Sequence, residues 1–249
     1  MTVYFIGAGP GAADLITVRG QRRIAESAVC LYAGSLVPAE LLDLCPENAV
    51  KVNTARMSLP DIVERIIAAD RDGHNVARVH SGDPSIYSAV AEQVRRLEQA
   101  GVDYEIVPGV PAFAAAAAAL GRELTVPGVG QTVILSRIAV DATAMPPGEE
   151  LRHLAQTRTT LVLHLAVGHI DRVVSELLPS YGPDCPVAVV AFASRPDEKI
   201  VRGTLGTIAE AVHAQEIRRT AVIIVGRVLA AEGFPDSYLY SVARTRTTH

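Results

Sequence analysis

Tryptophan is absent from this sequence, and aromatic residues make up only 4% of its 249 residues. Cysteine is also scarce, because Cys30, Cys45 and Cys185 are the only three, and they are widely spaced. An odd, scattered set of cysteines argues against a disulfide framework or a cysteine metal site. It is typical of a compartment that keeps thiols reduced, which we expect to be the cytoplasm. A net charge of −4 provides no broad basic surface, so we expect no nucleic-acid partner.

Long apolar runs are missing too. The apolar stretch at residues 110–120 is well short of the roughly 20 residues that a membrane-spanning helix needs. The N-terminus has no basic region and passes directly into a glycine loop, which indicates a first strand rather than a signal peptide. Apolar residues still make up 49% of the chain, which excludes a disordered protein. We therefore expect a folded core of small and β-branched residues, with no membrane partner.

The pattern over the first 110 residues alternates short apolar runs with helical segments. This alternation predicts βαβ units and a mostly parallel sheet. The expected strands are residues 3–6, 29–32, 76–79 and 104–107, and the expected helices are residues 17–26, 60–69 and 84–97.

The second half predicts a mixed sheet with helices. Its expected strands are residues 132–136, 160–165, 187–191, 199–202 and 220–225, and Asp197 and Glu198 are placed to start a hairpin return. Its expected helices are residues 112–120, 149–156, 170–178 and 205–213. We predict two α/β domains, residues 1–110 and 111–249, that pack directly on each other.

A glycine-rich loop follows the first expected strand. Gly7, Gly9 and Ala12 fit a loose form of the dinucleotide-binding fingerprint. Two features weaken that hypothesis. Pro10 removes an N–H from the loop, and no acidic residue follows the second strand to hold a ribose hydroxyl.

Two more loops follow expected strands in the same way. Residues 81–87 follow the strand at 76–79, and residues 107–112 end the next strand. Asp83 is suited to cap the following helix, with Pro84 at its first position, although a capped loop still presents its backbone to a ligand. Because ligands bind at the carboxyl ends of parallel strands, we expect the site at this edge.

Familiar catalytic constellations are missing from the sequence. There is no Gly-x-Ser-x-Gly nucleophile elbow and no His-x-x-x-His pair, and the seven histidines are scattered, so we expect no metal. A site of loops without an acid, base or metal suits a reaction whose reagent is already activated. Such a reaction needs positioning and exclusion of water.

Several motifs occur together in a fixed order and carry a resemblance. They are Gly7-Ala-Gly-Pro-Gly-x-x-Asp-Leu-Ile-Thr17, Gly82-Asp-Pro-Ser-Ile-Tyr87, Val107-Pro-Gly-Val110 and Gln131-Thr-Val-Ile-Leu-Ser-Arg137. In these the chain resembles the tetrapyrrole methylases, the S-adenosylmethionine-dependent methyltransferases of cobalamin and sirohaem synthesis. The match runs over nearly the whole chain. Residues 31–37, 131–137 and 193–204 look most like enzymes that methylate a precorrin ring.

The resemblance implies two α/β domains, a homodimer, and S-adenosyl-L-methionine held in the cleft between the domains, with S-adenosyl-L-homocysteine as the product. It assigns cofactor binding mainly to loop residues whose contacts are largely through backbone. By motif position these are Pro10, Ser81, Gly82, Asp83, Ile86, Pro111, Ala112, Leu165, Phe192, Ala193, Thr220 and Ala221.

One departure from the family pattern is informative. The uroporphyrinogen-III methylases carry an acidic residue after the Leu-Tyr of the second strand and a lysine some twenty residues on. This chain has Ala33 and, near the matching segment, Arg56. The acid/base pair proposed for those relatives is therefore missing, and the catalytic base is left unassigned.

Lysine is nearly absent, since only Lys51 and Lys199 accompany 21 arginines among the 23 basic residues. Genomic base composition explains such a bias, but arginine forks also suit the carboxylate arms of a tetrapyrrole. The expected substrate-binding residues are Arg56, Met57, Tyr87, Arg137 and Arg195. Three alternative functions remain open. They are a precorrin methylase that acts at C-17 or C-20 of the ring, a dinucleotide-dependent oxidoreductase, and a non-catalytic tetrapyrrole carrier.

Overall fold

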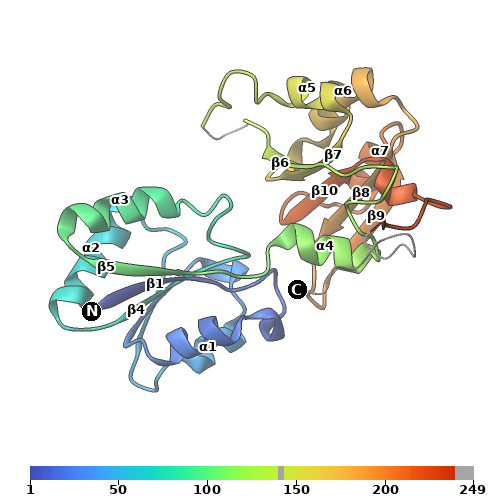
Figure 1. The fold of residues 1–249 in the computed structure, drawn as a ribbon. Coiled ribbons are helices and arrows are strands. Elements are labelled where there is room, and N and C mark those ends of the chain that lie inside the picture. The colour runs from blue at the N-terminus through green and yellow to red at the C-terminus, as the bar shows by residue number, and fades with distance from the viewer. Residues whose placement is uncertain (140–142, 239–249) are drawn as a thin grey trace. The chain divides into compact units, whose positions relative to one another are not determined.

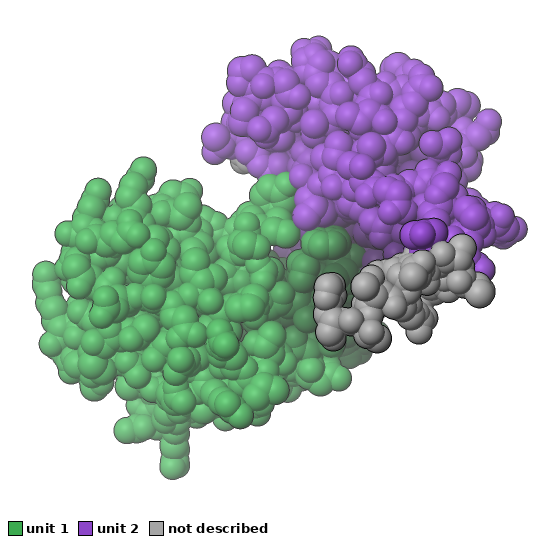
Figure 2. All heavy atoms as spheres, in the orientation of Figure 1, with its two compact units in different colours: residues 1–115, 194–196 green, residues 116–193, 197–249 purple. Residues whose placement is uncertain are grey.

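A computed structural model describes residues 1–139 and 143–238 of the chain. The chain divides into two compact units (Figure 2). Unit 1 is Met1–Ala115 together with Ser194–Pro196, and unit 2 begins at Ala116 and includes the rest of the described chain. The division at residue 110 stays a prediction about functional domains, and each unit is described below by itself.

Unit 1 is built on a five-stranded parallel sheet, as the sequence predicts. Its order is β3-β2-β4-β1-β5, with every neighbouring pair parallel. The strands are β1 (Thr2–Gly7), β2 (Val29–Tyr32), β3 (Val50–Asn53), β4 (Val76–His80) and β5 (Asp103–Val107). All five carboxyl ends therefore lie at one edge. β3 is the strand that the sequence analysis missed.

Helices cover both faces of this sheet (Figure 1). Phe5 and Val76 pack on the face covered by α2 (Leu59–Arg71) and α3 (Val90–Ala100). Tyr4 and Ile6 point to the opposite face, which is covered by α1 (Val18–Ala25) and the 3-10 segment Ala39–Leu44. A parallel strand buried on both faces is usually apolar throughout. β4 is buried along its whole length although it contains Arg78 and His80.

The helix ends explain which predictions are confirmed. Thr17 caps α1 by accepting a hydrogen bond from Gly20 N at 3.1 Å. Ser58 and Asp61 form a capping box at the start of α2, and Pro60 occupies its first turn. The prediction that the next helix starts at Pro84 is wrong, because α3 starts at Val90 and Asp83 is not its cap.

Unit 2 contains a mixed five-stranded sheet of order β6-β7-β10-β8-β9. β6 and β7 are parallel, β10 is antiparallel to β7 and to β8, and β8 and β9 form the expected antiparallel pair. The strands are β6 (Val133–Arg137), β7 (Thr160–His164), β8 (Pro186–Ala191), β9 (Lys199–Thr204) and β10 (Ala221–Val225). The carboxyl ends of β6, β7 and β8 therefore share an edge with the start of β10.

The helices of unit 2 pack against the apolar face of this sheet, where Leu161, Leu163 and Ile223 are fully buried. They are α5 (Leu151–Leu154), α6 (Ile170–Tyr181) and α7 (Ile208–Ala214), while α4 (Ala112–Leu120) begins in unit 1. The remaining 3-10 turns are Ala13–Leu15, Gly34–Leu36, Ala155–Thr157, Val167–His169 and Arg227–Ala230. Within the described residues, no helix has the length and apolar character needed to cross a membrane.

Candidate functional site

The first and central loops of unit 1 meet where β1 and β4 end. Gly9 N donates to Gly82 O at 3.2 Å, and Gly82 N donates to Gly9 O at 2.7 Å. This antiparallel bridge lies just beyond the parallel β1–β4 pair, and it places Pro10 and Ser81 in adjoining loops. The prediction that these loops gather at one edge of the sheet is confirmed.

Three glycines pack backbone against backbone at this edge. A Cβ on Gly7 would lie 2.6 Å from both Gly109 Cα and Gly82 O, and a Cβ on Gly109 would lie 2.3 Å from Gly82 O. Such distances leave no room for a side chain at Gly7 or Gly109. We call Gly7, Gly82 and Gly109 the glycine contact.

The glycine contact leaves one side of Gly82 open. A Cβ there would meet only Ala112 N at 3.8 Å and Pro111 Cα at 3.9 Å. Gly82 also has a φ of 65°, which favours glycine. The predicted residues Gly82, Pro111 and Ala112 therefore line the same small space, where a ligand can approach main-chain atoms.

Asp83 holds the central loop to the loop after β5. Its Oδ2 accepts a hydrogen bond from Gly109 N at 2.8 Å, and its Oδ1 accepts from Ser85 N at 2.8 Å and from the Ser85 hydroxyl. Partial burial alone would raise the pKa of Asp83, but the hydrogen bonds from Ser85 and Gly109 outweigh it and lower the pKa. Asp83 is thus an ionised structural tie between two loops.

The segment between Asp83 and α3 is strained. Tyr87 and Ala89 have φ values of 54° and 50°, a region that side chains with a Cβ disfavour. Ile86 N donates to Asp83 O at 3.3 Å, which keeps the half-buried Ile86 beside the loop. Tyr87 is 45% exposed, so its ring is accessible to a ligand from solvent.

A distant tripeptide completes unit 1. Ser194 Oγ accepts a hydrogen bond from Ala12 N at 3.0 Å, although the two residues are 182 positions apart. Ser194 also has a positive φ of 67°. The predicted substrate residue Arg195 follows it and is half-buried, so the structure brings Arg195 to the loop that contains Pro10.

Arg56 and Met57 lie in the turn after β3. The Arg56 side chain is exposed, whereas Met57 is half-buried and packs against the α2/α3 cluster. Met57 N donates to Thr54 O at 3.0 Å, which closes the turn. The structure places Arg56 and Met57 in a different loop from Tyr87.

In unit 2 the predicted residues gather at the shared edge of β7, β8 and β10. Phe192 N donates to Thr220 O at 2.9 Å, and Ala221 pairs with Ala191. Ile223 pairs with Leu163, which brings the end of β7 to the start of β10. The predicted residues at this edge are Leu165, Phe192, Ala193, Thr220 and Ala221.

Backbone strain marks the same segments independently. Among the described residues, eight that are not glycine have positive φ, and three of them, Ala89, Arg158 and Glu216, lie at helix ends. The other five are Tyr87, Leu165, Phe192, Ser194 and Thr220. Each such position costs on the order of 1–3 kcal/mol, and such strain clusters at functional sites. Leu165 is in addition 68% exposed.

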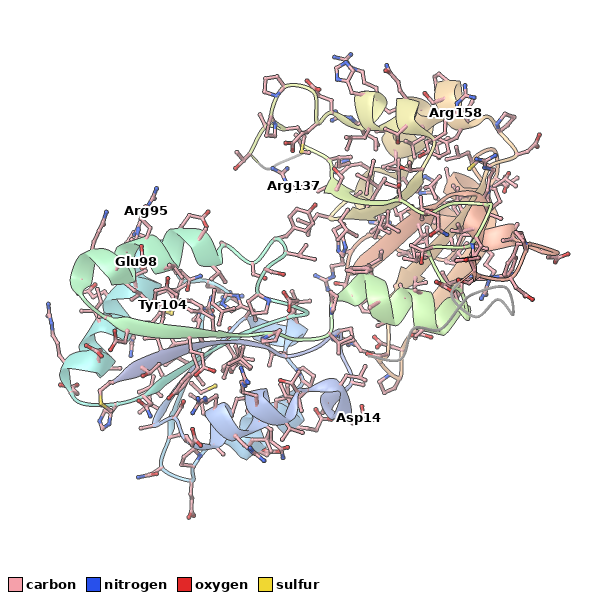
Figure 3. The ribbon with its side chains drawn as sticks, in the orientation of Figure 1. Asp14, Arg95, Glu98, Tyr104, Arg137 and Arg158 are labelled. Atoms are coloured by element: carbon pink, nitrogen blue, oxygen red, sulfur yellow. The ribbon has the colours of Figure 1, made fainter. Side chains whose placement is uncertain are left out.

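Arg137 lies at the carboxyl end of β6, as Figure 3 shows. Its guanidinium donates to Ile138 O at 3.3 Å and to Thr143 O at 2.8 Å. Two of its five donors therefore hold the following loop. Arg137 lies opposite His164 in the parallel β6–β7 pair, so both residues lie at the shared edge. Burial lowers the pKa of His164.

The described residues contain no group of three side chains that could hold a metal ion. His80, beside the central loop, is buried, and burial followed by the charge of Arg78 lowers its pKa to about 3. His80 is therefore neutral at pH 7, and the edge offers main-chain groups rather than an acid.

Three residues of this region escaped the sequence analysis. Ser194 lies in the segment 193–204 that carries the resemblance, but its partner Ala12 is 182 positions away in the chain, so no local pattern predicts its role. Gly109 lies in the Val107-Pro-Gly-Val110 motif, and its close approach to Gly7 and Gly82 is visible only in the structure. Arg78 is fully enclosed, and the signal for it was a charged residue in the middle of an apolar strand.

Comparison with known proteins identifies the family. The model of the Tetrapyrrole (Corrin/Porphyrin) Methylases matches residues 2–209. A Precorrin-4 C(11)-methyltransferase of Rhodococcus erythropolis is 68% identical over 249 residues, covering 100% of both chains. The solved structure of a cobalamin biosynthetic enzyme, cobalt precorrin-4 methyltransferase, has a TM-score of 0.89 at 42% identity and covers 92% of this chain and 95% of its own.

A second solved structure adds a ligand. The Uroporphyrin-III C-methyl transferase of Thermus thermophilus, complexed with S-adenyl homocysteine, has a TM-score of 0.78 at 31% identity, covering 92% of this chain and 99% of its own. The family model spans most of the chain and the R. erythropolis relative covers all of it. The fold, the loop geometry and these matches together show that the chain belongs to the tetrapyrrole methylases.

Proposed function

We propose that this chain transfers a methyl group from S-adenosyl-L-methionine to C-11 of precorrin-4, giving precorrin-5, during synthesis of the corrin ring of cobalamin. The R. erythropolis relative that supports this assignment matches over its full length. In the structure the glycine contact supports the cofactor part of this assignment, because it leaves main-chain atoms open beside Gly82, Pro111 and Ala112.

The described residues fit the cofactor. In unit 1, Gly82 with Pro111 and Ala112 presents backbone groups without bulky side chains, and Asp83 fixes the loop from within. Pro10, Ser81 and Ile86 adjoin it. In unit 2, strained backbone at Leu165, Phe192 and Thr220, with the small Ala193 and Ala221, marks the segments that the family resemblance assigns to the same ligand.

The chemistry requires little from side chains. When bound, S-adenosyl-L-methionine supplies an activated methyl group whose departure leaves a neutral thioether, so no proton need be donated. The chain must hold the electron-rich ring carbon in line with that methyl group and exclude water. This agrees with a site made mainly of loops and backbone.

The arginines are assigned to the substrate. A precorrin carries several acetate and propionate arms, and the guanidinium fork matches a carboxylate geometrically. We assign Arg56, Arg137 and Arg195 to these arms, with Met57 and Tyr87 against the macrocycle. Arg56 is the exposed member of the three.

The deciding experiment incubates the purified protein with precorrin-4 and S-adenosyl-L-methionine labelled in its methyl group, followed by NMR of the product. Label at C-11 is expected. Label at C-17 or C-20 would identify another precorrin methylase and overturn the assignment. A parallel reaction with cobalt-precorrin-4 determines whether the metal-free or the cobalt-containing ring is preferred.

Thermal shifts separate the other classes of function. S-adenosyl-L-homocysteine should raise the melting temperature, whereas NAD and FAD should not, because a ligand that binds only the folded state stabilises it. Binding of a tetrapyrrole without methyl transfer would indicate a carrier. A homodimer located in the cytoplasm completes the proposal, and light scattering of the purified protein tests its oligomeric state.

A further inference from the structure

A buried arginine lies at the centre of unit 1. Arg78 projects from β4, the middle strand of the sheet, and is only 5% exposed. Its Nε donates to Gln93 Oε1 at 3.1 Å, and its Nη1 donates to Thr54 Oγ1 at 3.1 Å and to Leu31 O at 3.4 Å. All three acceptors are neutral, and no carboxylate of the described residues forms an ion pair with Arg78.

Such an arrangement is costly for the fold. A buried charge without a counterion loses its hydration and recovers only part of it from neutral acceptors. Burial accordingly lowers the pKa of Arg78 to about 10, so the side chain remains charged at pH 7. An apolar residue at this position would satisfy the core, and the arginine therefore requires another explanation.

One branch of the network reaches the turn after β3. Thr54, which accepts from Arg78, donates from both its N and its Oγ1 to Tyr32 O at 3.0 Å. Thr54 O in turn accepts from Met57 N. Arg78 thus anchors the turn that carries Arg56 and Met57.

The other branch reaches the strained segment before α3. Gln93 accepts from Arg78 through Oε1 and donates from Nε2 to Ala89 O at 2.9 Å. Ala89 and Tyr87 are the two residues of this segment with positive φ. Gln93 has no freedom to turn its amide without losing both bonds, so Arg78 determines the position of the Ala89 carbonyl.

The cofactor segments of unit 1 are held by other bonds. The Gly9–Gly82 bridge and the Asp83–Gly109 hydrogen bond do not involve Arg78, Thr54 or Gln93. The network therefore connects two of the three unit 1 segments assigned to the tetrapyrrole, the third being Ser194–Pro196 with Arg195, and it does not include the bonds that hold the methyl-donor loops together.

We propose that Arg78 is a positioning residue for the tetrapyrrole substrate, acting through Thr54 on the Arg56–Met57 turn and through Gln93 on the Tyr87–Ala89 segment. This inference rests on the proposed function for the identity of the ligand. The positioning of the two loops is a property of the protein alone and can be measured separately.

The test uses the full chain with Arg78→Met and Gln93→Met, and Leu97→Met as the matched control. Leu97 is fully buried one turn further along α3 and takes no part in the network. For both network variants we expect the KM for precorrin-4 to rise at least tenfold, while the Kd for S-adenosyl-L-homocysteine stays within twofold. Leu97→Met should change neither constant by more than twofold.

Amide hydrogen exchange gives a readout that needs no substrate. Arg78→Met should accelerate exchange at Thr54 and Met57 at least tenfold and leave exchange at Gly82 and Gly109 within twofold. If both network variants change KM and Kd by the same factor, or change neither constant, the positioning role is overturned. If wild-type protein does not methylate precorrin-4 but the exchange pattern holds, the proposed function fails and the positioning role survives.

Discussion

Gly82 combines a positive φ with a place in the candidate cofactor site. Its φ is positive, and the space beside it is shared with Pro111 and Ala112. Gly101, which ends α3, has a similar φ of 70°, but a Cβ there would meet nothing within 4 Å. Alanine substitutions at Gly82 and Gly101 therefore share the same backbone strain, but only the one at Gly82 places a methyl group in the candidate site.

We expect Gly82→Ala and Gly101→Ala to lower the free energy of unfolding by a similar amount, about 1 kcal/mol, because both force a Cβ into the left-handed region. Only Gly82→Ala should weaken S-adenosyl-L-homocysteine binding, by roughly tenfold. Calorimetric titration and urea unfolding measure the two effects. Equal binding affinity in both variants would contradict a role for Gly82 in the cofactor site.

Arg137 is the second residue whose role can be isolated. Two of its donors bond Ile138 O and Thr143 O, and removing the side chain removes both hydrogen bonds. We expect Arg137→Ala to raise the KM for precorrin-4 about tenfold with a nearly unchanged Kd for S-adenosyl-L-homocysteine. Parallel steady-state kinetics and titration give both values, and equal losses for both ligands would mean that Arg137 only supports the fold.

At the scale of the element, β4 carries two polar side chains on its α2/α3 face, Arg78 and His80, and both are buried. His80 contacts the Phe5 ring with 5.9 Å between ring centroids. Burial, aided by the charge of Arg78, lowers the pKa of His80 from 6.5 to about 3. The folded state therefore holds the neutral ring, while the unfolded chain takes up a proton below pH 6.5.

This makes stability depend on pH in a defined direction. The contribution of the neutral His80 ring to the free energy of unfolding is complete above pH 6.5. It declines by about 1.4 kcal/mol for each pH unit as the pH falls towards 3. We expect His80→Gln to flatten this part of the profile in urea unfolding. The exposed His74 supplies the control, because His74→Gln should leave the slope as it is in the wild type. An unaltered slope in His80→Gln would contradict the assignment.

Most elements are predictable from sequence because their signals are local. The apolar runs of β1 and β2 and the Ser58–Asp61 capping box depend on nearby residues only. β3 was missed because its four residues, Val50–Asn53, form a partly exposed edge strand without an apolar run. The start of α3 was misplaced because Asp83, although suited to cap a helix, is used by Gly109 N, a partner 26 residues away.

Part of the candidate site is likewise predictable from local sequence, and part depends on contacts between distant residues. That the strand-end loops gather at one edge follows from a parallel sheet, and the sequence is sufficient to predict it. The Ala12–Ser194 and Arg78–Gln93 bonds depend on the tertiary fold, and no pattern in the chain announces them. The positive φ values of Leu165, Phe192 and Thr220 are equally hidden, because nothing in those residue types favours them.

At the scale of the whole molecule, unit 1 is not continuous in sequence. The chain leaves it within α4, returns for Ser194–Pro196 and leaves again. The Ala12–Ser194 hydrogen bond links this tripeptide to the first loop. A fragment that ended at Ala115 would therefore lack the Ser194–Pro196 part of unit 1.

We expect Ser194→Ala to lower the free energy of unfolding by about 1 kcal/mol, the usual contribution of a hydrogen bond, and to weaken S-adenosyl-L-homocysteine binding several-fold because the loop that carries Pro10 loses its tie. Ser175 is the control, since its hydroxyl donates only to Arg172 O on the exposed side of α6. Thermal melts and titration measure both. Binding that resembles that of Ser175→Ala would contradict the prediction.

The glycine contact has a consequence for inhibition. A compound that rests on Gly82 beside Pro111 and Ala112 meets main-chain atoms, and these are the same whichever residue the gene encodes. Gly7 and Gly109 cannot change to block such a compound, because any side chain there collides with backbone at less than 3 Å. Substitution of Gly7 or Gly109 therefore cannot give resistance to such a compound. Resistance mutations would have to change side chains around the glycine contact.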